Sequence, residues 1–437
     1  MSQTRLVNVV TPLGDELLFL SMSGREALGS PFCYEVELLS ESSKVDLSAL
    51  LGQTITLELE LEDGGVREFN GVVTYFSAMG AHGRYALYRA TVRPWLALLG
   101  NRRNSRIFQD KTVPEVVKEI FRDHGFSDFV ESLGPGYEPR TYLVQYRESD
   151  LNFVNRILEE EGIYYFFKHQ DRKTVLVLAD SYSAHEPVPG SETLPYFPPQ
   201  QREHRERDHI DGWTVFRQIR SGKVELADFD FEKPAVKLRS NTAMPAEHPH
   251  GDAEIYDYPG RFTQRAGGDR LSRLQMEEHL TDQEVAQASG NARAIYSGAL
   301  FTLQDFPRED QNKEYLVVEY SVELRDNSYE SGQARDTETE YRCRFTAIES
   351  KRPYHPPRVT PKPIVEGPQT AIVVGQEGKE IWTDNYGRVK LKFHWDRKEQ
   401  ADQTSSCWVR VAQLWAGSGF GGIHLPRIGQ EVIVDFL

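Results

Sequence analysis

Three groups of residues in this chain have types and spacings that could do chemistry. The first is the stretch WAGSGFGGIHLPRIGQEVIVDF, whose glycines could turn backbone N–H groups toward a phosphate. These glycines are Gly417, Gly419, Gly421 and Gly422. A phosphate loop needs a helix behind it and usually a Lys followed by Ser or Thr, whereas Pro426 and the strand-like segment 431–437 follow here. The stretch therefore predicts a turn that serves a sheet.

The second group is a set of histidines and aspartates that could hold a metal ion. They are His204, Asp208 and His209 in REHRERDHI, and His248, His250 and Asp252 in EHPHGD. Neither set has the HExxH pattern or a Cys/His ligand spacing, His204 and His209 do not share a helical face, and Pro249 interrupts the second set. We expect polar loops here and no bound metal.

The third group is the acidic run Glu159-Glu160-Glu161, which ends a predicted helix without an obvious partner. Carboxylate pairs hydrolyse glycosidic bonds, but 66 acidic residues make such pairs inevitable by chance. A GxSxG nucleophile motif is missing as well. The sequence nominates no catalytic residue and no cofactor site, so a cell-wall or polysaccharide hydrolase is the least favoured reading.

Length and composition favour a soluble protein of several domains. The 437 residues exceed what a single core holds, and no stretch is apolar enough to span a membrane. The N-terminus lacks the pattern of a cleaved signal peptide. The net charge of −15 argues against a nucleic-acid binder, and three widely separated cysteines fit a reducing compartment better than a disulfide scaffold. The cysteines are Cys33, Cys343 and Cys407.

The elements that would position these residues are mostly strands. Residues 54–76 alternate apolar and polar side chains around an Asp-Gly-Gly turn, which predicts a hairpin, and residues 85–92 predict another strand. The first 95 residues therefore predict a small antiparallel sheet or barrel. Further strands are expected within 212–231, 313–324 and 340–350.

Helices are expected in two regions. A capping box at Thr112 begins a helix whose apolar stripe predicts core packing, and Gly125 marks its end. The stripe consists of Val113, Val116, Val117, Ile120 and Phe121. A second helix spans about 149–161, and IYYFF and TVLVLAD after it predict a hairpin. A long polar helix is expected within 267–290.

A proline-rich segment, SKRPYHPPRVTPKP, predicts a linker before a compact β module. In that module GRVKLKFHWD, CWVRVAQ and EVIVDFL predict strands that close as a small barrel of the oligonucleotide/oligosaccharide-binding (OB) type. Residues 361–437 contain nine Lys and Arg and nine Asp and Glu, so the basic strand face of Arg388, Lys390 and Lys392 predicts solvated charge rather than nucleic-acid binding. The large aromatic residues of the module, Trp382, Trp395 and Trp408, are predicted to lie in its core.

Several segments together resemble the spike proteins of the type VI secretion system, the valine-glycine repeat (VgrG) family, over nearly the whole chain. These segments are RPWLALLGNRRNSRIFQDKTVPEVVKEI, YRESDLNFVNRILEEEGIYYFF, DFDFEKP, YDYPGRF, GRVKLKFHWDR and SSCWVRVAQLWAGSGFGGIHLPRIGQEVIVDF. The resemblance implies a mainly β fold with α+β parts, like the baseplate hub and tail-spike proteins of contractile-tailed phages. It implies two hub β-barrel domains with an intervening α/β segment, followed by a small OB-type barrel.

The same resemblance implies a division of the chain into five parts. They are a first hub barrel at 1–95, an α/β region at 96–200, a second hub barrel with a helical insertion at 201–352, a linker at 353–364 and an OB-fold neck at 365–437. In the family the neck continues into a β-helical needle, which these residues do not include.

The resemblance also implies a function by assembly rather than by catalysis. A homotrimer would cap the stack of a hexameric, Hcp-like tube protein, contact baseplate proteins and carry effectors or their adaptors, with a PAAR protein on the needle tip. Sheath contraction would drive this spike through a target membrane. It would be assembled in the cytoplasm and secreted without a signal peptide. The alternative is a hub of a phage or of a phage-like contractile particle.

Overall fold

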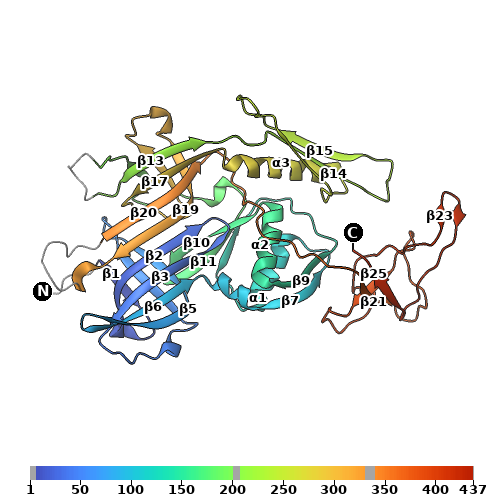
Figure 1. Ribbon diagram of the computed structural model, residues 1–437, viewed down its shortest axis with the longest axis horizontal. Coiled ribbons are helices and arrows are strands. Elements are labelled where there is room, and N and C mark those ends of the chain that lie inside the picture. Colours follow the sequence, from blue (N-terminus) through green and yellow to red (C-terminus); the bar gives the residue numbers. More distant parts are fainter. Residues whose placement is uncertain (1–5, 200–206, 330–339, 437) are drawn as a thin grey trace. The chain divides into compact units, whose positions relative to one another are not determined.

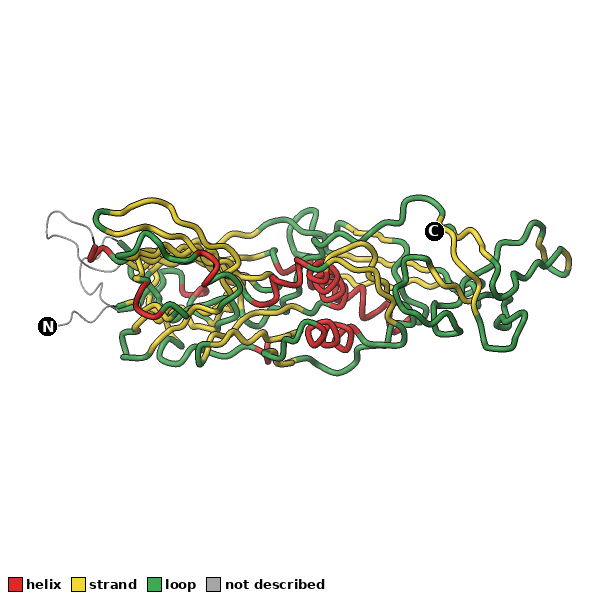
Figure 2. Tube along the Cα trace, turned by 90° about the horizontal axis from the view of Figure 1, so that it is seen from below, coloured by secondary structure: helices red, strands yellow, loops and turns green. Residues whose placement is uncertain are grey.

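The computed structural model describes residues 6–199, 207–329 and 340–436, and the chain forms two compact units. The first unit consists of Met1–Ala97, Asp128–Gly134 and Gly162–Arg358. The second consists of Leu98–Ser127, Pro135–Glu161 and Val359–Leu437. Most regular structure is strand (Figure 2), and the described chain has three α-helices besides several short 3-10 helices. The expectation of a mainly β fold with α+β parts is confirmed.

A twelve-stranded sheet dominates the described part of the first unit (Figure 1). Its strands lie in the order β1-β4-β5-β6-β3-β2-β19-β20-β17-β13, with β18 on β19 and β12 on β18. Their bounds are β1 Val7–Val10, β2 Leu18–Ala27, β3 Ser30–Ser40, β4 Thr54–Glu60, β5 Val66–His82, β6 Tyr85–Arg93, β12 Thr193–Pro195, β13 Ile210–Arg217, β17 Glu284–Gly290, β18 Leu300–Gln304, β19 Glu314–Arg325 and β20 Glu340–Glu349. All pairs are antiparallel except β12 with β18.

The sheet joins two stretches that are far apart in sequence. Strands β1 to β6 come from the first 93 residues, β13, β17, β19 and β20 come from residues 210–349, and β2 pairs with β19 where they meet. Gly24 on β2 lies at this junction. A Cβ atom there would stand 2.7 Å from the Tyr34 ring and 2.9 Å from Val322, so the close approach of the two halves requires glycine.

A three-stranded sheet packs against the large one in the same unit. It consists of β10 Tyr164–Gln170, β11 Lys173–Ala179 and β8 Phe129–Ser132. The expected hairpin of β10 and β11 is confirmed, and its two turn residues, Asp171 and Arg172, both have positive φ. Tyr164 and Phe166 share a buried core with Leu316 of the large sheet.

A small α/β module is inserted in the first unit. Its sheet contains β14 Lys223–Asp228, β15 Leu238–Ala243 and β16 Glu254–Asp257, and α3 Arg265–Thr281 covers one face (Figure 1). The expected helix over 267–290 is wrong in its second half, because residues 284–290 form β17. Strand β17 pairs on both sides, with β13 and β20, and these tertiary hydrogen bonds outweigh the helix propensity of the segment.

The second unit contains the other two α-helices, α1 Val113–Asp123 and α2 Asp150–Glu161, and the hairpin of β7 Arg103–Phe108 with β9 Leu143–Ser149. Thr112 caps α1 in the expected capping box, and Gly125 follows the helix with a φ of +78°. The apolar stripe of α1 is fully buried. The first helix therefore begins, ends and packs as its sequence predicts, and the second spans nearly the residues predicted for it.

The C-terminal module of the second unit has a three-stranded sheet of β22 Lys390–Phe393, β21 Gln369–Val374 and β25 Glu431–Val434, and a short hairpin of β23 Ala416–Gly417 and β24 Phe420–Gly421. Val389, Leu391 and Phe393 are buried on one face, as the alternation predicts. The expected strand CWVRVAQ is wrong: a single bridge from Val409 to Val389 is all the regular pairing there.

Candidate functional site

The described residues contain no converging group of three His, Cys, Asp or Glu side chains that could hold a metal ion. His248 lies in an exposed loop with its Nδ1 atom 3.0 Å from the carbonyl oxygen of Pro249. Asp208 accepts a hydrogen bond from the backbone N–H of Arg293 at 2.7 Å, and His204 lies outside the described residues. The remaining three, His209, His250 and Asp252, also lie in loops or turns. These side chains serve loop structure.

The glycine-rich stretch forms a hairpin, not a phosphate loop. Strand β23 pairs with β24 across a two-residue turn, in which Gly419 has a φ of +80°. A Cβ atom on Gly417 would stand 2.2 Å from the Phe420 ring, and Gly421 has a φ of +132°. The glycines are therefore required by a tight turn, as the sequence predicts.

The basic strand face of the C-terminal module is paired within the chain. Arg388 forms an ion pair with Asp384, and Lys392 with Asp396 at 2.8 Å. Lys390 donates to the carbonyl oxygen of Ser406 at 2.6 Å. Two of the three cations are therefore balanced by carboxylates of the same module. Of the three tryptophans, Trp395 packs on the buried core, and Trp382 and Trp408 are half-buried and contact each other at 4.6 Å between ring centroids.

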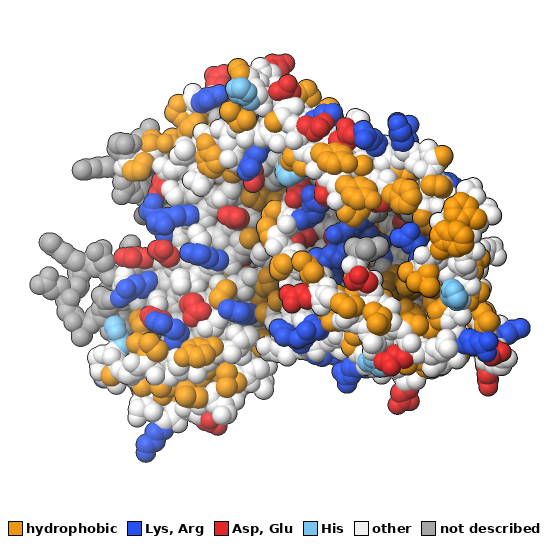
Figure 3. Space-filling model, turned by 45° about the vertical axis from the view of Figure 1, so that its right-hand side comes forward, with side chains coloured by type: hydrophobic (Ala, Val, Ile, Leu, Met, Phe, Trp, Pro, Cys, Tyr) orange, Lys and Arg blue, Asp and Glu red, His pale blue; other side chains and the backbone are white. Residues whose placement is uncertain are grey.

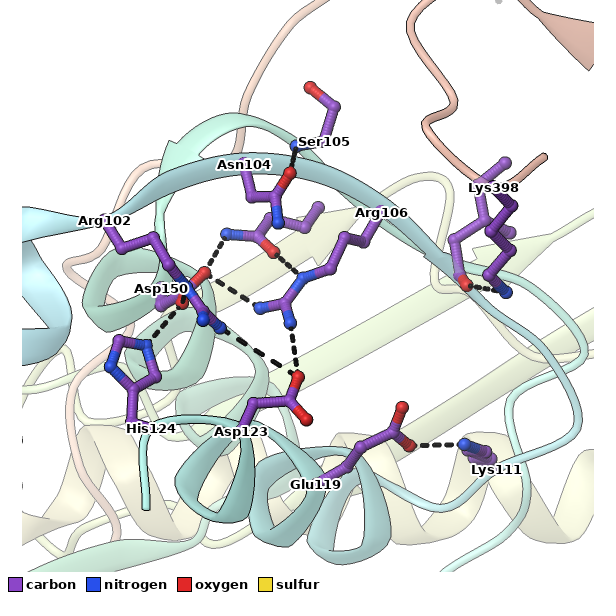
Figure 4. Close-up of polar contacts among 12 residues, drawn as sticks. Arg102, Asn104, Ser105, Arg106, Lys111, Glu119, Asp123, His124, Asp150 and Lys398 are labelled. Carbon is purple, nitrogen blue, oxygen red and sulfur yellow. Dashed lines mark hydrogen bonds and ion pairs between the residues drawn. The ribbon is translucent and has the colours of Figure 1, made fainter. Parts of the chain in front are cut away.

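The densest polar cluster of the second unit surrounds Asp150, the first residue of α2 (Figure 4). Its carboxylate is buried and accepts four side-chain hydrogen bonds. Oδ2 accepts from Arg102 Nε at 2.6 Å and lies 2.7 Å from His124 Nε2, and Oδ1 accepts from Arg106 Nη2 at 2.8 Å and from Gln145 Nε2 at 2.7 Å. These donors come from β7, β9 and the segments flanking them and α1.

The electrostatics of this cluster identify it as structural. Burial alone would raise the pKa of Asp150, but the hydrogen bonds from His124 and Gln145 and the charge of Arg106 outweigh it, so the pKa lies below its usual range. Arg106 also pairs with Asp123 at 3.0 Å. A carboxylate whose four acceptor positions are filled has no capacity left to act as base or nucleophile. The cluster joins two helices and a hairpin.

The acidic run at the end of α2 does find partners. Glu161 forms an ion pair with Arg140, and Glu159 accepts from the backbone N–H of Thr360 at 2.9 Å. No local pattern indicates the contact with Thr360, because this residue stands 201 positions from Glu159 along the chain. The expectation that the run lacks a partner is wrong, and Glu159 holds Thr360 inside the proline-rich linker.

A second polar network lies inside the large sheet of the first unit. Arg67 on β5 is buried and donates to Tyr320 on β19 at 2.9 Å and to Tyr341 on β20 at 3.2 Å. The same guanidinium lies 3.4 Å from the carboxylate of Glu26 on β2, which also accepts from Tyr34 at 2.9 Å. Burial raises the pKa of Glu26, against the opposing charge of Arg67.

These contacts show that the large sheet curls on itself. In the order of pairing, β5 and β20 are separated by β6, β3, β2 and β19. Five steps in a flat sheet would separate them by about 24 Å, which is beyond the reach of an arginine and a tyrosine. Arg67 therefore spans the inside of a barrel-like curve. His169 of β10 closes this network from the other sheet: it accepts from the Asn70 N–H at 3.1 Å and lies 3.1 Å from the Tyr34 hydroxyl.

Comparison with known proteins identifies this architecture. A family model of the phage tail baseplate hub matches residues 25–328, which is more than half of the chain, and a model of the type VI secretion system/phage-baseplate injector OB domain matches residues 369–437. The type VI secretion system spike protein VgrG1a of Pseudomonas aeruginosa is 45% identical over 440 residues, which is 100% of this chain and 68% of that protein. The chain belongs to the family of type VI secretion system spike proteins.

Two further comparisons define what the family match covers. The spike protein VgrG1b of Pseudomonas aeruginosa is 46% identical over 436 residues, and this chain spans 59% of its length. The solved structure of Escherichia coli c3393, described as a type VI secretion component similar to the T4 bacteriophage tail proteins gp27 and gp5, has a TM-score of 0.69 at 22% identity, covering 99% of this chain and 96% of that chain. The match confirms the hub-like fold of this spike-family chain.

The network around Asp150 predicts a large loss of stability on substitution. In Asp150→Asn the cations of Arg102 and Arg106 would lose their buried counter-charge, and we expect the free energy of unfolding to fall by about 3–5 kcal/mol. The matched control is Asp123→Asn, whose side chain is 46% exposed and which should cost at most about 1 kcal/mol. Urea unfolding followed by circular dichroism measures both.

The same experiment has a pH dependence. Because the folded-state pKa of Asp150 lies below its ordinary 3.8, its contribution should be present above about pH 4 and be lost as the pH falls through the lower folded value. The difference between wild type and Asp150→Asn should therefore shrink in acid. Equal losses for the two aspartate variants at neutral pH would contradict the structural role of the cluster.

The network around Arg67 makes a second prediction. Arg67→Met should lower the free energy of unfolding by about 3–5 kcal/mol, because it leaves the Glu26 carboxylate buried without a cation. The loss should grow as the pH rises above the raised folded-state pKa of Glu26, because beyond that pH the wild-type carboxylate is ionised beside Arg67, whereas in the variant it would be ionised without a cation. Adding Glu26→Gln should recover part of the stability. The control is Arg25→Met, at the exposed residue that precedes Glu26. This substitution should change the free energy of unfolding by less than about 0.5 kcal/mol.

Proposed function

We propose that this chain is the hub and neck of a type VI secretion spike. Three copies would assemble, the hub would receive the hexameric ring of the tube protein, and sheath contraction would drive the spike and its effectors through a target membrane. The observation that carries this proposal is the order of the two matches: a phage baseplate hub at 25–328 followed by an injector OB domain at 369–437 in one chain.

The architecture of the first unit supports the proposed match between three copies of this chain and six tube subunits. Its sheet combines one set of strands from the first 93 residues with another from residues 210–349, and β2 and β19 join them. Three copies would then present six strand-rich halves to a ring of six tube subunits. A threefold object can meet a sixfold ring in this way without a change of subunit number.

The polar groups of the chain support a role without catalysis. Asp150 accepts four side-chain hydrogen bonds and Arg67 donates to four acceptors, all inside their own units. On the face shown in Figure 3, acidic, basic and apolar side chains are interspersed. Binding energy spread over symmetric interfaces is what a mechanically loaded hub needs.

The partners and location in this proposal follow the family. They are the Hcp-like tube protein, baseplate proteins, effectors or their adaptors, and a PAAR protein reached through a needle. The spike would be assembled in the cytoplasm and leave with the machine that carries it. None of the helices in the described residues is long and apolar enough to cross a membrane. We also propose that the domains of this chain end at residues 95, 200, 352 and 364.

A hub of a phage or of a phage-like contractile particle is the second candidate, because the hub fold is shared with phage tails. The 45–46% identity to secretion spike proteins over the full chain favours secretion. Genes for a membrane complex beside this one would support secretion, and capsid genes would support a phage.

The test is reconstitution with the hexameric tube protein from the same genome. Native mass spectrometry of the mixture should show three copies of this chain bound to one hexamer, and electron microscopy should show them at one end of tube stacks. The matched control is a tube protein from a distant system, which should bind weakly. Tube stacks that form without bound chain at tens of micromolar would overturn the proposal.

A further inference from the structure

The glycine-rich hairpin projects a surface that the C-terminal module itself does not use. We call residues 413–424 the neck arm. Its base is closed by Gln413, whose side chain accepts from the backbone N–H of His424 at 2.8 Å and donates to the His424 carbonyl oxygen at 3.4 Å. Its tip is the turn between β23 and β24. Between the base and the tip, the backbone N–H of Gly422 donates to the carbonyl oxygen of Trp415 at 2.9 Å. The arm is therefore an ordered hairpin.

The neck arm is apolar on its outside. The exposed fractions are 96% for Leu414, 66% for Trp415, 60% for Phe420 and 79% for Ile423. The rings of Trp415 and Phe420 contact each other at 5.6 Å between centroids. Four large apolar side chains on one exposed hairpin are more than a monomeric surface usually displays, and such patches mark contact sites.

A second exposed apolar surface lies on the sheet of the same module. Ile433 on β25 is 78% exposed, although Val434 beside it is buried in the core. Ile433 pairs directly with Thr370, and Glu431 pairs with Ile372, so these four residues share the outer face of the sheet. We call them the outer face. A strand with apolar residues on both sides indicates a sheet that is covered on both sides.

Charge does not oppose a contact between copies at the C-terminal module. The neck arm contains no Lys, Arg, Asp or Glu, and Glu431 on the outer face lies 3.5 Å from His394 of the same module. Residues 361–437 as a whole are neutral, so the formal charge of −15 lies in residues 1–360. Copies of this acidic chain can thus approach one another with least repulsion at this module.

We propose that the neck arm of one copy packs on the outer face of the next copy. The two surfaces are different, so the contact is head-to-tail and repeats around an axis until a ring of three closes. Trp415 and Ile433 expose apolar surface to water in a single copy, and the contact would bury it. Removing this apolar surface from water favours association. This inference rests on the proposed trimeric spike and names the segments that hold its neck.

Disulfide trapping on the full chain tests the contact. Trp415→Cys protein is mixed with Ile433→Cys protein under mild oxidation and run on a non-reducing gel. We expect a two-chain band in the mixture at least tenfold stronger than in either variant alone. The double variant Trp415→Cys/Ile433→Cys should give three-chain species. Wild type sets the background from the three native cysteines, and Tyr386→Cys, at a 55% exposed site of the same module, replaces Trp415→Cys as the control.

Light scattering on the same samples separates the contact from the trimer itself. Threefold mass with no cross-link above the Tyr386→Cys control would overturn the arm contact and leave the proposed function standing. Cross-linking of Trp415→Cys alone to itself would also overturn it, because it indicates a symmetric contact between arms. Single-chain mass in every sample, with no cross-link, would overturn both. Both substituted side chains are exposed, so the folding of one copy should not change.

Discussion

One buried guanidinium holds the largest part of this structure together. Arg67 lies on β5, and its guanidinium donates hydrogen bonds to tyrosines of β19 and β20. These tyrosines are more than 250 positions away in sequence. The contact is possible because the sheet curls, and it stabilises the curl because a buried cation must keep its partners. Glu26 supplies the counter-charge from the strand at the junction of the two halves. The halves are therefore one body, as the proposed mechanical role of the hub requires.

Asp150 plays a comparable part in the second unit. It stands at the N-terminus of α2, where the helix dipole favours a negative charge, and it gathers donors from the hairpin and from the end of α1. In the same unit the C-terminal module is tied to β9, since Gln369 donates to the Tyr146 hydroxyl at 2.7 Å and accepts from the Trp395 indole at 3.0 Å. The polar groups of these clusters therefore join structural elements to one another.

The sequence predicted what depends on neighbours along the chain. The capping box at Thr112, the turn between β10 and β11, and the alternation of Val389, Leu391 and Phe393 are local patterns, and each is confirmed. The errors arise where distant segments decide. Residues 284–290 are a strand because β13 and β20 pair with them, and the partner of Glu159 is Thr360 of the linker. The clusters around Arg67 and Asp150 were missed for the same reason, because no local signal connects their members.

The proposed hub and neck depend on self-association of this chain. The most direct test is the solution mass of the purified 50.0 kDa chain by multi-angle light scattering over a wide concentration range. We predict a stable species of three times that mass, since six strand-rich halves and a closed ring of neck arms both require three copies. A single-chain mass at every concentration would contradict the claim that these residues form the trimeric hub and neck.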